Sequence, residues 1–589
     1  MEGLEVTVLL GLATLVGTAL APKLRIATPL LLVIIGLALG FVPQLREIQL
    51  PPETVLLLFL PVMLFWESLT TSLRTIRRAL RYIVPMSTLL VVASAFGVAW
   101  IATLFGMPWQ TGLLLGAAVA PPDATAVAAL GRLLPQRMFM KLKAESLTND
   151  GTALVVYAIA LSLALGENVT GWSITASVLI SYLGGAAAGI AVAALAYLAL
   201  RSTRSTLVIN ITLLIVPFLA FLLAEFVEAS GVLAVVIAGL IVAWMHSRIT
   251  TAASRRQATA AWPFGVYLLN GALFVLIGLE VQYVVHDIPG RLIGILLLIS
   301  VAAWIALIVV RYLFLLLFAP FSHPAGGQLF GHNRARIVNT MAGFRGAVSL
   351  AIALSVPVTV NGSGDLSGRD AIVFVTAGVI LLSLLVQGPM LPAIVRWARL
   401  PQDALAEDEY ELAQRTISGA ALSALDDIAD EHGISANVRD RARREGYEML
   451  ELANARAYAR QQQTDDAQIA ELETMLDEPD AADTGPVLEV GQVPPPTVAA
   501  ASGALGADGT AAASALQMLA TSDGIDLSQR SPITQFEEAT RLKLALLDRK
   551  RTVLQRMRRE GTIDDLVVHR IEAHLDLEEV RLSGIEQLD

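Results

Sequence analysis

The chain contains no cysteine, which excludes disulfide bonds, a thiolate nucleophile and any metal site built on cysteine. Charged residues are also scarce: they make up 16% of the 589 residues, against roughly a quarter in a typical globular domain, whereas 55% are hydrophobic. This composition is too apolar for an ordinary soluble protein. Residues 1–5 include no basic segment and no small-residue cleavage site follows. We therefore expect the first apolar stretch to be a retained helix and not a signal peptide.

The few charges are segregated along the chain. Residues up to about 400 include 15 acidic and 24 basic residues, a net charge of +9, and the remainder includes 37 acidic and 18 basic residues, a net charge of −19. This asymmetry predicts a membrane domain over 1–400 followed by an acidic, mostly helical tail. Within the tail we predict a helical segment over 401–477, a disordered linker over 478–530 and a second helical segment over 531–589. The tail has no glycine-rich nucleotide-binding motif.

Apolar stretches long enough to cross a bilayer recur from residue 5 to residue 397. We count thirteen, at roughly 5–21, 27–42, 53–71, 82–105, 110–131, 143–165, 171–200, 205–225, 230–247, 262–285, 291–319, 336–358 and 370–396. Basic residues gather in alternate loops, and the opposite loops contain only Arg46, Arg291 and Arg369. The positive-inside rule then places the N-terminus outside and the tail in the cytoplasm. We expect a multi-pass protein of the plasma (inner) membrane.

Four acidic residues lie well inside the predicted spans: Glu67, Asp123, Glu145 and Asp150. A charge at membrane depth costs at least about 3 kcal/mol, so an intramembrane carboxylate is a functional-site hypothesis by default. No histidine falls in the middle of a span. A proton that crosses the membrane is therefore expected to be carried by a carboxylate.

Two predicted spans are interrupted. Asp123 follows Pro121 and Pro122 in the fifth span, and because proline has no backbone N–H, carbonyls in the preceding turn lose their helical partners. In lipid, such backbone is tolerated only where protein or a water-filled cavity satisfies it. The twelfth span has a matching interruption at residues 343–346. If spans 1–6 and 8–13 are inverted repeats, these two breaks correspond, as expected of a transporter site.

Spacing within the sixth span brings polar groups onto common helix faces. Glu145 and Asn149 are four residues apart, as are Ser146 and Asp150. Ser146 and Asp150 can therefore offer a hydroxyl and a carboxylate oxygen to one cation, and hard cations prefer oxygen ligands. We expect the buried Arg311 of the eleventh span to pair with Glu145, which leaves Asp150 able to exchange its counter-ion.

Less specialised interpretations stand beside these. Glu67 either lines the site or gates it, or it extends to the interface from the end of its span. Ser146 either contacts the ion or hydrogen-bonds to its own helix. Gly343 and Gly346 either break the helix or serve close helix packing alone. The acidic tail is either a solvated helical surface or a sensor of pH or of a partner.

Several of these motifs together resemble the sodium/proton antiporters of the sodium–hydrogen exchanger type, the first monovalent cation:proton antiporter family. The resemblance covers roughly residues 5–397. The motifs that carry it are Pro-Pro-Asp at 121–123, Glu-Ser-Leu-Thr-Asn-Asp at 145–150, Ser-Gly-Val-Leu-Ala at 230–234, Gly-Phe-Arg-Gly-Ala at 343–347 and the stretch from Leu60 to Glu67. Bacterial members also have tails similar to residues 575–579.

This resemblance implies a fold and a cation site. The fold would have thirteen helices, with inverted repeats and crossed, unwound helices 5 and 12, usually in a homodimer. Asp150 would bind the cation and the proton in turn. Asp123 and Ser146 would complete the Na⁺ shell, together with the backbone near Pro122.

The same resemblance assigns supporting roles to other residues. Asn149 would order the crossing, Glu145 and Arg311 would form a structural ion pair, and Arg345 would compensate charge at the helix break. Because related electrogenic exchangers have two adjacent aspartates where this chain has Asn149 and Asp150, the resemblance implies electroneutral exchange.

The sequence thus predicts a secondary antiporter, not an enzyme, that exchanges Na⁺, with Li⁺ as a second substrate, one for one with H⁺ by alternating access around Asp150. Its partners would be these ions, membrane lipid and a second copy of the chain, without a cofactor or nucleic acid. Potassium/proton exchange is the alternative within the class, because ligand distances set selectivity. An intramembrane aspartyl protease also uses two acids, but its Gly-x-Gly-Asp context is missing. A channel would need a repeated filter, and none is found.

Overall fold

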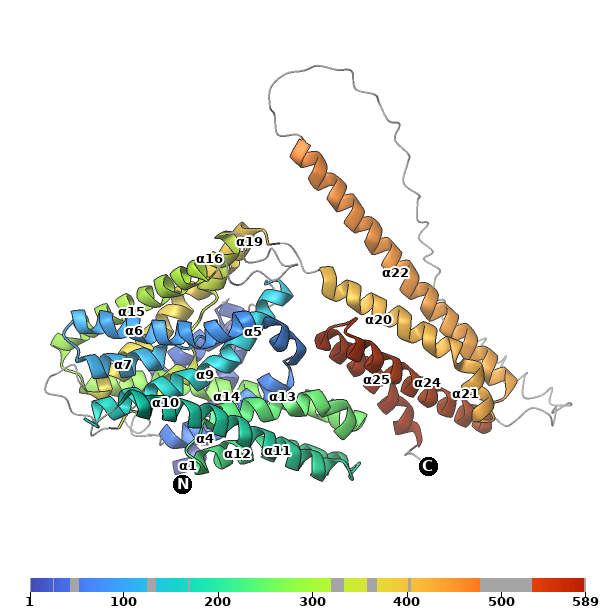
Figure 1. The fold of residues 1–589 in the computed structure, drawn as a ribbon, viewed down its shortest axis with the longest axis horizontal. Helices are drawn as coiled ribbons and strands as arrows, with labels where there is room; N and C mark the ends of the chain where they lie inside the picture. The colour runs from blue at the N-terminus through green and yellow to red at the C-terminus, as the bar shows by residue number, and fades with distance from the viewer. Residues whose placement is uncertain are drawn as a thin grey trace, which may run out of the picture. The chain divides into compact units, whose positions relative to one another are not determined.

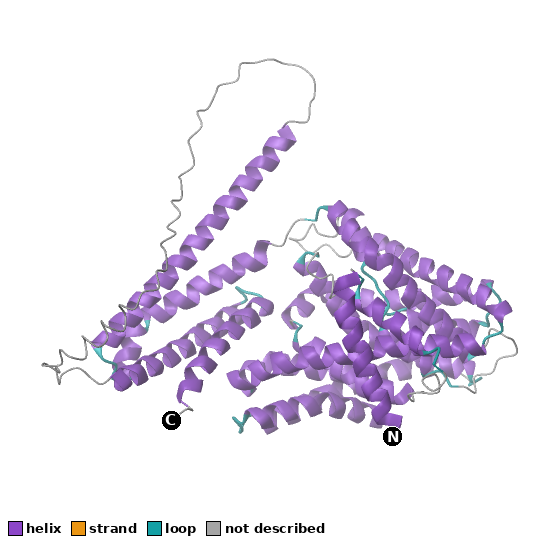
Figure 2. Cartoon of the chain, turned by 180° about the vertical axis from the view of Figure 1, so that it is seen from behind, coloured by secondary structure: helices purple, strands orange, loops and turns teal. Residues whose placement is uncertain are grey.

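The computed structural model describes residues 2–24, 26–42, 52–71, 73–123, 134–167, 170–318, 333–357, 368–400, 404–476 and 532–586. Within these residues the secondary structure is helical and includes no strand (Figure 2). The predicted linker over 478–530 lies outside the described residues, as does the end of the fifth predicted span. The chain divides into two compact units: residues 1–410 together with 557–589 form the first, and residues 411–556 form the second.

The first half of the membrane part contains these helices in order (Figure 1): α1 (Glu2–Leu24), α2 (Thr28–Leu39), α4 (Pro52–Leu69), α5 (Leu73–Ser87), α6 (Leu89–Leu104), α7 (Trp109–Val119), α9 (Gln136–Ala164), α10 (Gly171–Leu179), the π-helix η2 (Ile180–Gly184) and α11 (Gly185–Leu200). The second half contains α12 (Thr206–Phe226), α13 (Gly231–Ile249), α14 (Ala252–Asp287), α15 (Gly290–Leu317), α16 (Asn333–Met341), α17 (Ala347–Leu354), α18 (Arg369–Leu382), the π-helix η5 (Ser383–Gln387) and α19 (Gly388–Ala398).

Every one of the thirteen predicted spans coincides with one or more of these helices, which confirms an all-helical membrane fold. Eight helices are long and apolar enough to cross a membrane, and four shorter apolar ones accompany them among the described residues. Three helices begin well before the predicted spans: α5 at Leu73, α9 at Gln136 and α14 at Ala252. α14 starts at Ala252 because Thr251 and Ser254 form a capping box, and α9 starts directly after Pro135.

Buried side chains form two main cores, and α4, α9 and α14 contribute to both. The first core also gathers residues of α1, α2, α6, α7, α15, α17 and α18, and the second also gathers residues of α5, α11, α12 and α13. Small residues allow close approach within the first core: a Cβ on Gly36 of α2 or on Gly278 of α14 would overlap the backbone of the facing helix. Membrane helices associate through such van der Waals contact, because lipid gives no hydrophobic drive between them.

The second unit comprises α20 (Ala404–Ser423), α21 (Leu425–Glu431), α22 (Ala436–Leu476) and most of α24 (Pro532–Glu560). Leu542 of α24 is fully buried beside Ala429 and Val438, and Lys543 forms an ion pair with Glu445 at 3.0 Å. The two helical segments on either side of the predicted linker therefore fold together.

The last helix, α25 (Asp565–Glu586), belongs to the first unit. It packs against α14 and α5. Its Asp576 accepts two hydrogen bonds from the guanidinium of Arg255, at the start of α14, and both side chains are largely buried. Sequence analysis gave no sign of this contact, since the two residues are 321 positions apart.

Candidate functional site

Two helix breaks meet at the centre of the candidate site. α7 ends at Val119 and residues 120–123 are not helical, and residues 342–346 form a non-helical segment between α16 and α17. The backbone N–H of Asp123 donates to the carbonyl oxygen of Phe344 at 2.8 Å, which ties one break to the other. Backbone groups freed by one interruption are thus satisfied by the other, as a membrane interior requires.

Gly346 makes this approach possible. A Cβ at this position would overlap the Asp123 carboxylate, so any larger residue would displace either the carboxylate or the backbone. Gly343 faces the Arg311 side chain, and a Cβ on this glycine would lie 3.1 Å from the arginine Cδ. The glycines of the twelfth span therefore serve close approach at the break.

A cavity of about 20 Å³ lies beside the crossing, which is room for one water molecule or one bare cation. Its polar lining comes from four elements: Glu67 of α4, Asp123 of the first break, Ser146 and Asp150 of α9, and Ser349 of α17. The remaining lining residues are Leu60, Met63, Leu64, Pro121, Pro122 and Val348. The structure thus brings together Asp150, Asp123, Ser146, Pro122 and Glu67 around one small space.

The lining combines carboxylates with hydroxyl groups, and most of it is shielded from solvent. Asp150 and Ser146 are buried, at 5% and 6% exposure, and Asp123 and Glu67 are partly buried. Among the described residues, no group of three or more His, Asp or Glu side chains is close enough to hold a metal ion. A cation here would be held by carboxylate and hydroxyl oxygens together, which are ligands that suit hard cations.

Asn149 connects the helix of Asp150 to the broken span. Its side-chain amide donates to the carbonyl oxygen of Pro122 at 2.9 Å, and the residue is fully buried. Its Oδ1 has no hydrogen-bond partner among the described residues. The Pro122 carbonyl is therefore fixed from α9, one residue before Asp123.

Arg311 and Glu145 form a buried bidentate ion pair beside the cavity, with N–O distances of 2.6 and 3.0 Å. Neither side chain is more than 3% exposed. Asn339 of α16 accepts two further hydrogen bonds from Arg311 through its backbone and side-chain oxygens, and donates to the Tyr82 hydroxyl at 2.8 Å. Sequence analysis missed Asn339 and Tyr82. The only sequence feature that could have indicated them is that each is a polar residue in a predicted apolar span.

Arg345 occupies the second break and is 4% exposed. Its guanidinium donates to the carbonyl oxygens of Val119, at 2.5 Å, and of Gly343, at 2.7 Å. These are carbonyls at the ends of the interrupted helices, where the helix dipole leaves partial negative charge. The side chain therefore bridges both breaks.

Lys143 is a third residue that the sequence did not single out. It lies on α9, and its ammonium group donates to the hydroxyl of Thr70, the residue after the end of α4, at 2.6 Å. Glu67 is on the same end of α4 and interacts electrostatically with Lys143. A basic residue thus adjoins the carboxylate at the edge of the cavity.

A bundle of apolar helices with two broken helices that cross beside intramembrane carboxylates defines a secondary transporter. The family of this chain follows from comparison with known proteins. A profile of the transmembrane sodium/hydrogen exchanger matches residues 10–397, and the chain belongs to the sodium/hydrogen exchanger family. It is therefore a multi-pass membrane transporter of the cation/proton antiport class.

Relatives of known name agree with this assignment. The chain is 35% identical over 588 residues to an uncharacterised Na⁺/H⁺ exchanger of Mycobacterium tuberculosis, covering 98% of this chain and 96% of the relative. It is 30% identical to the Na⁺/H⁺ antiporter ApNhaP of Aphanothece halophytica, over 69% of this chain and 76% of that protein. The sodium proton antiporter MjNhaP1 of Methanocaldococcus jannaschii has a similar fold, with a TM-score of 0.54 at 18% identity over 67% of this chain and 99% of that one.

Proposed function

We propose that this protein exchanges one Na⁺ for one H⁺ across the plasma membrane, with Asp150 as the group that binds either ion, and that Li⁺ can replace Na⁺. The observation that carries the proposal is the grouping of Asp150, Asp123, Glu67 and Ser146 around one small cavity at the crossing of two broken helices. The names of relatives such as ApNhaP support Na⁺ and H⁺ as the exchanged ions.

Competition for one site gives the coupling. Like charges around a shared cavity repel one another, and either a bound cation or a proton relieves that repulsion. A charged, empty site is costly to carry through a bilayer, so the site crosses only when it is occupied. Since each occupant brings one positive charge to Asp150, the exchange is electrically silent.

Neighbouring groups restrict the stoichiometry to one cation for one proton. Glu145 is fully engaged by Arg311, which leaves it unable to trade a proton for a cation. Asn149 is neutral and holds the Pro122 carbonyl. The exchange therefore uses the protein's own side chains and no cofactor. We further propose that the N-terminus lies outside and α20–α24 in the cytoplasm, because basic residues concentrate in alternate loops. A homodimer is proposed from the family resemblance alone.

The test uses purified protein in liposomes with a trapped pH dye and an imposed proton gradient. Addition of Na⁺ or Li⁺ should dissipate the gradient, and a membrane voltage clamped by an ionophore should leave the rate unchanged. A rate that follows the clamped voltage would overturn one-for-one exchange. A response mainly to K⁺ would replace the proposed cation and keep the class of transporter.

A further inference from the structure

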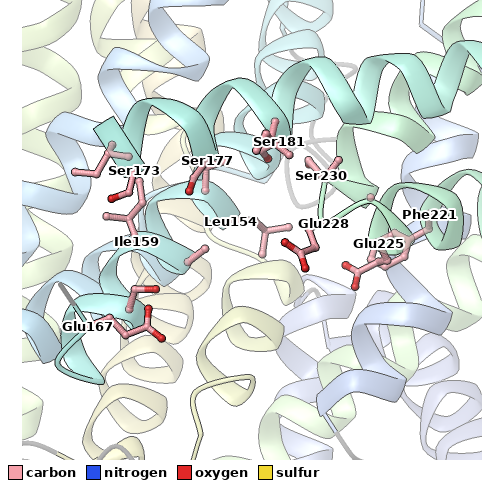
Figure 3. Close-up of a pocket in the computed structure, with 17 residues that line it drawn as sticks. Leu154, Ile159, Glu167, Ser173, Ser177, Ser181, Phe221, Glu225, Glu228 and Ser230 are labelled. Atoms are coloured by element: carbon pink, nitrogen blue, oxygen red, sulfur yellow. The ribbon is translucent and has the colours of Figure 1, made fainter. Parts of the chain in front are cut away.

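A second, larger cavity lies along the other half of α9. Its volume is about 510 Å³, and it is lined by α9, by α10 with the π-helix η2, and by the end of α12 with the turn that joins it to α13 (Figure 3). The Asp150 cavity borders this helix at Ser146 and Asp150, whereas the larger cavity borders it from Leu154 to Ser162. The two cavities are therefore distinct and follow each other along one helix.

The lining of this cavity includes several serine hydroxyls and carboxylates among its apolar side chains. Ser177 and Ser181 are four residues apart, so their hydroxyls follow one face of α10 and η2. Glu225 and Glu228 line it from the end of α12 and the turn that follows (Figure 3). Both helices are otherwise apolar enough to span a membrane, with mean hydropathies of 2.0 and 2.7. Carboxylates and hydroxyls in such helices are expected to face water and not lipid.

The stretch of α9 between Asp150 and this cavity contacts the other walls of the cavity. The next residues on α9 are Gly151, which faces the Ser230 hydroxyl, and Thr152, whose hydroxyl hydrogen-bonds to that of Tyr182 at 2.6 Å. Ser230 in turn donates its backbone N–H to the Ser181 carbonyl at 3.2 Å. Tyr182 belongs to the π-helical turn, and such turns are common at functional sites. Leu154, on the cavity wall, is one helical turn beyond Asp150.

We propose that this cavity is the vestibule through which hydrated monovalent cations reach Asp150 from the side of the membrane opposite the arginine-rich loops, with Glu225 and Glu228 drawing the cation in and the Thr152–Tyr182 hydrogen bond closing the inner end. The inference rests on the proposed exchange at Asp150. It adds an access route and two carboxylates that set the apparent affinity on one side only.

Physical reasons favour a cation as the occupant. A lined cleft with charge of one sign focuses the field and raises the local concentration of counter-ions. The volume exceeds that of an ion with six first-shell waters, about 180 Å³ at about 30 Å³ per water, so a cation can enter with its water and shed it only at the smaller Asp150 cavity. An ion that must reach an intramembrane carboxylate needs such a wet path.

The first test is kinetic. In right-side-out vesicles, the double variant Glu225→Gln/Glu228→Gln should raise the apparent KM for external Na⁺, by up to about tenfold at low ionic strength. Its maximal rate and its KM for Na⁺ from the tail side should stay unchanged. Asp370→Asn is the matched control, because Asp370 is an exposed carboxylate predicted on the same side and lies outside the cavity lining. An equal shift of KM on both sides, or a shift in the control alone, would overturn the proposal.

The second test exploits the absence of cysteine, since the natural chain needs no background substitution. A membrane-impermeant, positively charged thiol reagent should label Ser177→Cys from outside, and Na⁺ should slow the labelling. Leu179→Cys is the control, because Leu179 is on the same turn, is 50% exposed and does not line the cavity. Equal labelling of the two thiols, or labelling of neither, would contradict a water-filled vestibule.

The two proposals fail in different ways. If the unmodified protein exchanges no cation in liposomes, the function at Asp150 is wrong. If the unmodified protein exchanges Na⁺ and the double variant shows the same external KM, exchange at Asp150 stands and the vestibule is wrong. Tyr182→Phe, which removes the barrier hydrogen bond, should raise the rate of proton leak in the absence of Na⁺ above that of the unmodified protein. An unchanged leak would remove Thr152 and Tyr182 from the barrier.

Discussion

The α-carbon of Gly346 lies so close to the carboxylate of Asp123 that a methyl group at this position would overlap Oδ2. The two residues are on opposite broken segments, and the hydrogen bond from Asp123 to Phe344 joins the same segments. The position of the carboxylate is therefore set by the backbone of the other break.

Gly346→Ala should displace Asp123 while leaving the bundle folded. We expect the exchange rate to fall by about tenfold or more, since an increase of about 1.4 kcal/mol in the activation free energy slows a rate tenfold. Gly294→Ala is the control, because a Cβ there meets no atom within 4 Å. Proteoliposome rates for the two variants, with protein amounts matched, check the prediction. Full exchange by Gly346→Ala would show that the carboxylate position is not critical.

Asp150→Asn should abolish exchange and preserve folding. An amide has nearly the shape of a carboxylate but neither trades a proton for a cation nor offers a negative charge. We expect the elution volume in size-exclusion chromatography and the melting temperature to remain close to those of the unmodified protein. Measurable Na⁺-driven proton movement in this variant would rule out Asp150 as the exchanging group.

Arg311→Ala should instead reduce the amount of folded protein. Removal of the guanidinium leaves Glu145, which is fully buried, without its partner, at a cost of about 3–5 kcal/mol. Asn339 would lose its contact with Arg311 as well. A melting curve in detergent measures the effect. Replacement of both members of the ion pair, in Arg311→Met/Glu145→Gln, should recover part of the lost stability. A double variant less stable than Arg311→Ala would show that the unpaired Glu145 is not the cause of the destabilisation.

Acidification should loosen the last helix. Burial lowers the pKa of His569 below its usual value, and the positive charge of Arg558 lowers it further. The carboxylates of Glu572, Asp565 and Asp564 raise this pKa, but burial is the largest effect. His246 of α13 interacts with the same ring. Because the folded state then binds fewer protons than the unfolded one, the stabilisation is complete above a pH of about 6.5 and is lost as the pH falls below it.

Hydrogen exchange of α25 amides at about pH 7.5 and about pH 5.5, corrected for intrinsic rates, measures this loosening. Protection should drop at the lower pH in the unmodified protein. His569→Gln removes the titrating group and should make the two values more alike. The same drop in both proteins would assign the effect to other groups.

The membrane fold was predictable because lipid imposes a simple rule. A membrane span must be long, apolar and helical, and the number of basic residues in a loop indicates on which side of the membrane the loop lies. The Pro-Pro-Asp and Gly-Phe-Arg-Gly breaks were visible for the same reason, since few residues interrupt an apolar helix. What the sequence did not reveal was partners on other helices. Nothing local distinguishes Asn339 or Tyr82 as partners in the Arg311 network, and Lys143 looked like one more basic residue in a loop.

The cavity lined by Glu225 and Glu228 was missed for a related reason. Both acids fall at the predicted end of a span, where an acid is ordinary, and serine is common in membrane helices. Only the fold shows that Ser177 and Ser181 face those carboxylates across an open space. The contact between Arg255 and Asp576 was equally invisible, because it depends on which helices lie together and not on any spacing along the chain.

Because α25 belongs to the same unit as the membrane helices, residues 411–556 have membrane-unit residues on both sides in the sequence. Residues 411–556 form a unit whose two ends both continue into the membrane unit, so topologically they are a domain inserted into a loop and not a free tail. A stop codon after residue 400 would remove a piece of the transporter itself and leave Arg255 without Asp576. Excision of the inserted domain, with a short linker between residues 410 and 557, is the deletion that would isolate its contribution.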